Sequence, residues 1–198
     1  MTTDDPTTGA GLDYARRLYS AVVAWYDNAD RKAQIILTAN GGFVTVLTGF
    51  GLSRPDEIDR TVTVFGVETW LFAGLAAVSV VVAFASAAAC LWSRLLLPAR
   101  RDALLEQRGV TLRDAGTYDP SVLWFFQFVE RLDERALETR LRALSPADEI
   151  DALADQAIQL ARRVTTKHWF VNVGFAATAL GLSSLLATAV SYVARLAA

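Results

Sequence analysis

The sequence predicts an all-α, multi-pass membrane protein whose three transmembrane helices extend into a small cytoplasmic helical bundle. The chain of 198 residues is 53% hydrophobic yet 20% charged, and its mean hydropathy is +0.30, so apolar and charged residues must be segregated. Three uncharged stretches each approach the length of a helix that spans a bilayer. No segment shows the alternating pattern and turn residues that are typical of paired strands.

The composition also narrows the classes of function. The net charge of −2 gives no basic character that would favour nucleic-acid binding. The chain has a single cysteine, Cys90, and a single histidine, His168, which argues against a disulfide framework, a metal cluster or a catalytic triad. It contains no P-loop, GxGxxG, HExxH or GxSxG motif. We therefore expect neither enzymatic activity nor a cofactor.

The N-terminal residues divide into a tail and a helix. Residues 1–11 are polar and acidic, so we expect a flexible N-terminus without a signal peptide. From residue 12 onward, apolar residues recur every three or four positions, and neither proline nor glycine interrupts residues 12–39. An amphipathic helix should therefore continue directly into the first span, within a region 12–97 that also holds the second.

The three predicted spans are uncharged. The first covers 35–52, the second covers 70–92 between two tryptophans, and the third covers 169–193 before a short tail at 194–198. Tryptophan and tyrosine suit the ends of a span, because their rings are apolar and their polar groups need water or headgroups. Three buried helices of a soluble bundle are the alternative, which is disfavoured because uncharged runs this long are rare in soluble cores.

The placement of lysine and arginine predicts the orientation. Basic residues are concentrated before the first span and between the second and third, whereas the 53–67 loop is mainly acidic. By the positive-inside rule, the N-terminus and the sensing segment 98–168 should be cytoplasmic, with the protein in the cell (inner) membrane.

The segment before the third span has a clear helix start. Ser145 can cap a helix, Pro146 suits its first position and Asp148 follows in the first turn, so we expect one helix from about 146 to 193. Upstream we expect an extension of span two at 100–109, a loop at 111–120, a short aromatic helix at 121–132 and a charged helix at 134–144.

Small residues recur at four-residue spacing within the second and third spans. The pairs are Ala73 with Ala77, Ala83 with Ala87, Ala85 with Ala89, and Ala177 with Gly181. Such faces let helix backbones approach closely, within or between subunits. A general alanine bias of the chain explains the same pattern, and both readings stay open.

Several polar residues lie in or beside apolar stretches, where their presence requires an explanation. Asn40 and Asn172 lie inside spans one and three, where an amide is costly unless it is hydrogen-bonded, so each should face another helix or water. Beside Asn40, Gly41 should permit close packing. The aromatic residues at 124–128 cannot all lie on one side of a helix, and core packing is the default for them, with a membrane surface or planar ligand as the alternative.

Charged residues mark the cytoplasmic rim of the same spans. An ion pair between Asp30 and Lys167 would tie the first and third spans together. For Lys32 we favour the alternative that its side chain extends to the headgroups. That alternative does not apply to Asp30, because a carboxylate gains nothing from anionic headgroups.

These stretches follow a recognisable order. An A-D-x-K-A stretch leads into L-x-x-N-G at 29–41, paired phenylalanines follow at Phe125 and Phe126, and a helical run at 152–161 ends at Lys167. In this order and spacing the chain resembles, over nearly its whole length, the transmembrane effectors of Pycsar, the bacterial antiphage system built on pyrimidine cyclases. It departs from the family pattern at Trp124, Gln127, His168 and Trp169.

The resemblance implies a protein that senses a nucleotide and then kills the infected cell. Cyclic CMP or cyclic UMP, made during phage infection, would be recognised on the cytoplasmic side, and the membrane part would then impair the bilayer and kill the cell. An anionic nucleotide needs cationic donors and a flat surface for its base. The residues expected to bind it are Asp30, Lys32, Trp124, Phe125, Phe126, Arg131 and Lys167, and those expected to gate the membrane part are Asn40, Gly41 and Asn172.

The expected partners are the lipid bilayer, the cyclic nucleotide and further copies of the chain in a homo-oligomer. Two other functions stay open. One is a non-enzymatic membrane scaffold whose cytoplasmic bundle recruits another protein, and the other is a small channel subunit that conducts without a nucleotide.

Overall fold

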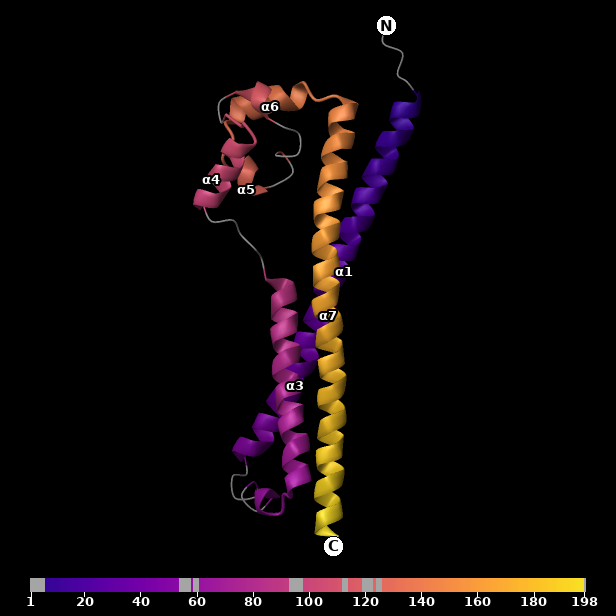
Figure 1. Cartoon of the computed structure of the whole chain (residues 1–198), viewed down its shortest axis with the longest axis vertical. Coiled ribbons are helices and arrows are strands. Elements are labelled where there is room, and N and C mark those ends of the chain that lie inside the picture. Colours follow the sequence, from indigo (N-terminus) through magenta and orange to yellow (C-terminus); the bar gives the residue numbers. More distant parts are fainter. Residues whose placement is uncertain are drawn as a thin grey trace. The chain divides into compact units, whose positions relative to one another are not determined.

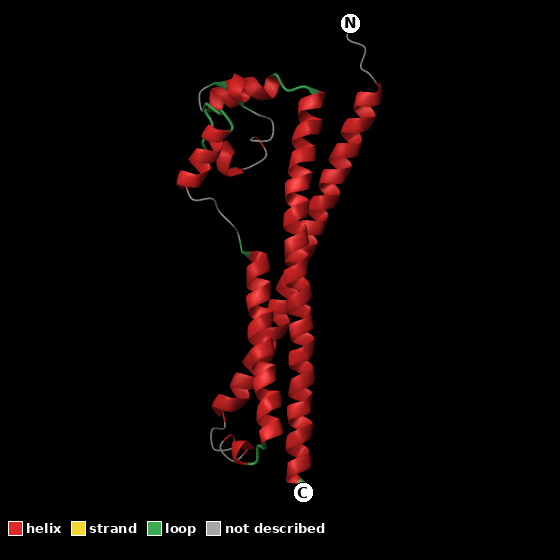
Figure 2. Cartoon of the chain, viewed as in Figure 1, coloured by secondary structure: helices red, strands yellow, loops and turns green. Residues whose placement is uncertain are grey.

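The computed structural model describes residues 6–53, 58, 61–92, 98–111, 114–118, 123 and 126–197. All regular secondary structure within these residues is helical, which confirms the predicted all-α class (Figure 2). The chain divides into two compact units. Unit 1 comprises Met1–Tyr26 and Ser93–Val164, and unit 2 comprises Asp27–Trp92 and Thr165–Ala198.

Two long helices each contribute to both units. Helix α1 runs unbroken over Pro6–Ser53 and helix α7 over Pro146–Leu196, which agrees with the continuous helices predicted from residues 12 and 146. Residues 6–11, which were predicted to belong to a flexible tail, are part of α1. Within unit 2, helix α3 (Val67–Leu91) lies beside both of them (Figure 1). A three-helix arrangement therefore forms unit 2.

The predicted number of spans is wrong for the part of the chain that the structure describes. Two helices there, α3 and α7, are long and apolar enough to cross a membrane, and α1 is not among them. The stretch 35–52 contains Asn40, three threonines and four glycines, which lower its hydropathy. Only the backbone of residues 50–53 is described.

Small residues form the core of unit 2. Its buried members come from all three helices: Ala29, Ala33, Ile36, Ala83, Ala87, Cys90, Val171 and Ala177. Two of the predicted small-residue pairs, Ala83 with Ala87 and Ala177 with Gly181, are buried in this way. The other two pairs are not, since Ala77, Ala85 and Ala89 are exposed. Helix packing therefore accounts for two of the four pairs.

Gly174 marks a point of close approach in this core. A Cβ at this position would lie 2.9 Å from Ile36 Cδ1 and 3.6 Å from Ser86 Cβ. We predict that Gly174→Leu destabilises unit 2 by about 1–3 kcal/mol, because the larger side chain forces the helices apart. The matched control is Gly74→Leu on α3, where a Cβ would meet no described atom within 4 Å. Thermal unfolding in detergent compares them, and equal midpoints would contradict the close contact.

The described part of unit 1 contains four short elements besides its portions of α1 and α7. They are α4 (Pro98–Gln107), a single 3-10 turn η1 (Ala115–Thr117), α5 (Phe126–Val129) and α6 (Glu134–Arg142). Helix α6 confirms the predicted charged helix, and the predicted loop at 111–120 contains η1. The buried apolar side chains of this unit include Leu105, Val110, Tyr118, Phe128 and Ala136. Its position relative to a membrane stays a prediction.

The predicted continuation of span two into 100–109 is wrong. Helix α3 ends at Leu91, and Trp92 is extended, with φ −63° and ψ 114°. Helix α4 is a separate element that starts at Pro98, a residue suited to the first helical position. It is followed by Gly109, whose φ of +67° is a conformation that glycine adopts without strain.

The start of α7 forms as predicted. The Asp148 carboxylate accepts the Ser145 N–H (2.9 Å) and hydroxyl (2.7 Å), while the Ser145 hydroxyl oxygen accepts the Asp148 N–H (3.2 Å). Arg140 of α6 donates to the same carboxylate (3.2 Å). The hydrogen bonds from Ser145, followed by Arg140, lower the pKa of Asp148 from its ordinary 3.8.

This pKa shift predicts how acid affects unit 1. Because the pKa of Asp148 is lower in the folded protein, its contribution to stability is complete above pH 3.8 and is lost as the pH falls through the folded value. We expect Asp148→Asn to flatten the loss of stability below about pH 4. Thermal unfolding followed by circular dichroism over this range measures the slope. Asp151→Asn, at an exposed position of the same helix, is the control and should leave the slope unchanged.

Candidate functional site

A partly buried ion pair between α1 and α7 is the centre of the candidate site. The Lys167 ammonium donates to the Asp30 carboxylate, and their side chains are 12% and 28% exposed. The Cys90 thiol of α3 lies 3.9 Å from the same carboxylate oxygen and 3.8 Å from the Ala29 carbonyl oxygen. All three helices of unit 2 therefore meet at one charged point, and the predicted Asp30–Lys167 pair is confirmed.

The position of Lys167 on α7 explains why it turns inward. Val164 and Val171, three residues before it and four after it, are both buried, so Lys167 lies on the buried face of the helix. On α1, the fully buried Ala29 adjoins Asp30 and lets the helices approach. The Lys167 ammonium thus binds a carboxylate instead of extending to headgroups.

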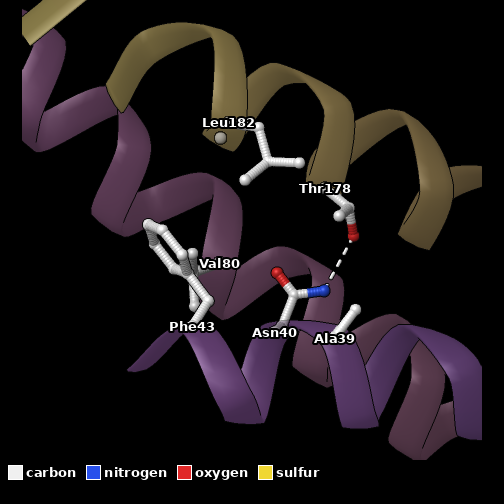
Figure 3. A pocket seen from close by; sticks show the side chains of 7 residues that line it. Ala39, Asn40, Phe43, Val80, Thr178 and Leu182 are labelled. Atoms are coloured by element: carbon white, nitrogen blue, oxygen red, sulfur yellow. Dashed lines mark hydrogen bonds between the residues drawn. The ribbon is translucent and has the colours of Figure 1, made fainter. Parts of the chain in front are cut away.

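A second polar contact lies further along the same two helices. The Asn40 side-chain N–H group donates to the Thr178 hydroxyl and to the Ile36 carbonyl oxygen, both at 2.8 Å (Figure 3). Thr178 in turn donates to the Gly174 carbonyl oxygen (2.9 Å). Asn40 is only 4% exposed, so the prediction that it faces another helix is confirmed.

A cavity of about 40 Å³ adjoins Asn40 in unit 2. Its lining comes from all three helices and is almost entirely apolar: Ala39, Asn40, Phe43, Val80, Thr178, Gly181 and Leu182. In Figure 3 the Asn40 side-chain oxygen points away from Thr178, toward the side of Val80 and Leu182. A space of this size holds at most a few water molecules.

Two other residues predicted to gate the membrane part are placed differently. A Cβ at Gly41 would meet no described atom within 4 Å, so the close packing predicted there is wrong. This part of the helix turns Asn40, rather than its glycine neighbour, toward α7. Asn172 is exposed on α7 and faces no other helix in the described part of this copy, so of the two predicted environments, another helix or water, the second stays a prediction.

The predicted nucleotide-binding residues are only partly described. Arg131 is exposed after α5, and Lys32 is half-buried on α1. Trp124 and Phe125 lie outside the described residues, and for Phe126 only the backbone is described. Their contacts with a ligand stay a prediction. Phe128 is buried beside Tyr118, so core packing explains this member of the aromatic run.

The sequence reasoning missed Thr178 and Cys90. Asn40 follows Asp30 by ten residues, and Thr178 follows Lys167 by eleven, so the two polar contacts have almost equal spacing on both helices. In two parallel helices, nearly equal spacing places both contacts at matching depths. Once the Asp30–Lys167 pair was assumed, this spacing would have identified Thr178 as the partner of Asn40. No comparable signal identifies Cys90, because its role depends on the third helix.

Other ion pairs of α7 are more exposed. In unit 1, Arg16 of α1 binds Glu149 through two hydrogen bonds (2.7 and 2.9 Å), which lower the pKa of that carboxyl group. In unit 2, Arg195 binds Glu68 of α3 (2.6 and 2.8 Å). Exposed pairs of this kind contribute little to stability. The Asp30–Lys167 pair, like the Arg140–Asp148 pair of unit 1, is less exposed than either of them.

Comparison with known proteins identifies a family for the chain. The family model of the Pycsar effector protein domain matches residues 14–195, a range that covers most of both units and every residue of the two polar contacts. No curated protein and no solved structure matches the chain.

Proposed function

The chain belongs to the Pycsar effector protein family, and from this premise we propose that it is an antiphage effector that a cyclic pyrimidine nucleotide activates in the membrane. The nucleotide is cyclic CMP or cyclic UMP from a cognate cyclase, and the active effector impairs the membrane so that the infected cell dies. The family match over residues 14–195 carries this proposal. Two helices long enough to span a bilayer support the membrane location.

Recognition of the nucleotide is assigned to the sensing segment of unit 1. The exposed Arg131 supplies a guanidinium group, which suits a phosphate because it donates two parallel hydrogen bonds. Trp124, Phe125 and Phe126 would supply the flat surface on which a pyrimidine base stacks. The two lysines that the resemblance implies belong to unit 2: Lys32 is half-buried, and Lys167 could reach a phosphate only by exchanging its Asp30 partner.

Activation would act on the contacts between α1 and α7. Both helices continue without a break from unit 1 into unit 2, so a rotation or shift of either one is carried along its own backbone. Such a movement changes the Asp30–Lys167 pair and the Asn40–Thr178 hydrogen bond together, because both contacts join the same two helices.

Titration calorimetry on the full chain in detergent tests the recognition step. Cyclic CMP or cyclic UMP should bind, and cyclic AMP, a purine nucleotide, is the matched control. Co-expression with an active cyclase should reduce survival and admit a membrane-impermeant dye, and a catalytically inactive cyclase should do neither. Absence of binding to both pyrimidine nucleotides together with full survival would refute the proposal. A leak in liposomes without any nucleotide would favour the channel subunit instead.

A further inference from the structure

The side-chain oxygen of Asn40 is a buried acceptor in unit 2, and no described residue donates a hydrogen bond to it. Both N–H bonds of the amide are used, one by the Ile36 carbonyl oxygen and one by the Thr178 hydroxyl, each at 2.8 Å. Because a carbonyl oxygen can only accept, the Ile36 contact fixes which end of the amide is the nitrogen. The amide oxygen therefore lies on the other side, in a residue that is only 4% exposed.

An acceptor in this position needs a donor. A buried polar group without a hydrogen bond is destabilising, and the large majority of such groups in folded proteins have a partner. The other buried polar contact between α3 and α7 is satisfied directly, since the hydroxyl oxygens of Thr69 and Ser191 are 2.7 Å apart. The Asn40 oxygen requires a donor that the described part of the chain does not supply.

The cavity of about 40 Å³ lies where this oxygen points. In Figure 3 the Asn40 oxygen points toward the side of Val80 and Leu182, which line the cavity together with it. Gly181 marks the close approach of α7 to α3 that bounds this space, because a Cβ there would lie 3.3 Å from Ser79 Cβ. The acceptor and the space for a donor therefore coincide.

The chemistry of the lining selects a neutral hydrogen-bond donor. A cation needs several oxygen ligands in place of its hydration shell, and among the described lining residues only Asn40 and Thr178 carry a side-chain oxygen. An anion is repelled by the partial negative charge of the amide oxygen. A water molecule donates hydrogen bonds and needs about 10–15 Å³ of such space, so the cavity has room for roughly two or three.

The Thr178 hydroxyl offers a water molecule its second contact. The hydroxyl oxygen has two lone pairs, and in the described part of the chain only one of them accepts a hydrogen bond, from Asn40. The hydroxyl hydrogen is already donated to the Gly174 carbonyl oxygen (2.9 Å). A buried water typically makes about three hydrogen bonds, and a second water in the same cavity supplies the remaining one.

We propose that this cavity is a binding site for water, which donates a hydrogen bond to the Asn40 side-chain oxygen and joins it to Thr178. The inference deepens the proposed function and rests on it in one respect, that activation rearranges the Asn40–Thr178 contact. When α1 and α7 separate there, the bound water takes over hydrogen bonds that the two side chains lose. The contact then opens at a lower cost in free energy.

The infrared stretching band of the Asn40 side-chain carbonyl tests the site, because a hydrogen bond weakens the C=O bond and lowers its frequency. The full chain is placed in lipid bilayers with asparagine isotopically labelled at this carbonyl. It has three asparagines, and subtracting the spectrum of the labelled Asn40→Leu variant isolates the Asn40 band. We expect the frequency of a hydrogen-bonded amide carbonyl. The frequency of a free carbonyl would overturn the inference.

Filling the cavity should expel the water. Val80→Leu enlarges a lining side chain and should shift the Asn40 band to the frequency of a free carbonyl. The matched control Val81→Leu makes the same change on a side chain that is 66% exposed and outside the lining, and should leave the band in place. Leu182→Phe in the lining and Leu186→Phe outside it repeat the comparison on α7. An unchanged band in both filled variants would place the donor outside the cavity and contradict the site.

Ser79 is the side chain that would replace water as the donor if its hydroxyl turned toward Asn40. It is 3% exposed on α3, where it lies close to Gly181 of the cavity lining. Ser79→Ala should leave the Asn40 band unchanged. A shift of the band to the frequency of a free carbonyl would assign the hydrogen bond to the Ser79 hydroxyl and overturn the inference.

The spectra are recorded without nucleotide, so their outcome is separate from nucleotide binding and from killing, which are measured in parallel on the parent chain. A hydrogen-bonded Asn40 carbonyl that responds to filling, in a chain that neither binds a cyclic pyrimidine nucleotide nor kills, supports the water site and refutes the proposed function. A free Asn40 carbonyl in a chain that binds the nucleotide and kills refutes the water site alone.

Discussion

Asp30→Leu should abolish nucleotide-dependent killing while the protein still inserts into the membrane. The substitution removes the carboxylate that Lys167 binds and leaves a largely buried ammonium group in its place. Removing one partner of a buried ion pair costs about 3–5 kcal/mol, and the 28% exposure of Asp30 places the expected loss near the lower end. Survival of cells that carry an active cyclase measures killing, and thermal unfolding in detergent measures stability.

Two further variants separate a switching role from a structural one. Asp27→Leu changes an exposed carboxylate one turn earlier on α1 and should leave killing and stability near those of the parent. The double variant Asp30→Leu with Lys167→Met removes both charges and should recover most of the lost stability. It should still fail to kill, because no ion pair remains to be rearranged. Recovery of killing in the double variant would show that the pair only stabilises the fold.

Asn40→Leu should also remove killing, but with a much smaller effect on stability. The variant loses the hydrogen bonds to Thr178 and Ile36, and such bonds between membrane helices contribute only about 0.6–1.7 kcal/mol. Leucine has a similar size, and the adjoining cavity of about 40 Å³ gives its branch room. Survival with an active cyclase, thermal unfolding and the membrane-bound fraction are the three measurements.

The partner and a nearby exposed residue provide the controls for Asn40. Thr178→Val removes the hydroxyl that accepts the Asn40 hydrogen bond and should reproduce the loss of killing. Thr38→Val, at an exposed position on α1, should retain killing. If Asn40→Leu kills as well as the parent chain, the Asn40–Thr178 bond has no part in activation.

The two asparagines show what sequence patterns could not distinguish. Asn40 and Asn172 are the same residue type at comparable places in predicted spans, and each was expected to face another helix or water. Asn40 is buried against α7, whereas Asn172 is exposed. The difference arises because only one side of each helix contacts its neighbours, and spacing along one helix does not say which side that is.

The Asp30–Lys167 ion pair, in contrast, could be predicted from the sequence. Asp30 and Lys167 were predicted to meet because each lies just before an apolar stretch, so two parallel helices bring them to the same level. The start of a long apolar stretch therefore predicts which distant residues lie at the same level, even when the contacts between the helices are not known. Cys90, which completes the site, was not foreseen, because its height depends on where α3 starts and ends.

The sequence by itself determined the helical class, the unbroken course of α1 and α7, and the capped start of α7 at Ser145. These features depend on interactions within a few residues, such as capping hydrogen bonds and the absence of proline and glycine from residues 12–39 and 147–173. Only the tertiary structure decided that α3 ends at Leu91, which alanines form the core, and that the Thr178 hydroxyl accepts a hydrogen bond from Asn40. The last two outcomes depend on which helix faces meet, since burial is a property of the pair of helices and not of either one alone.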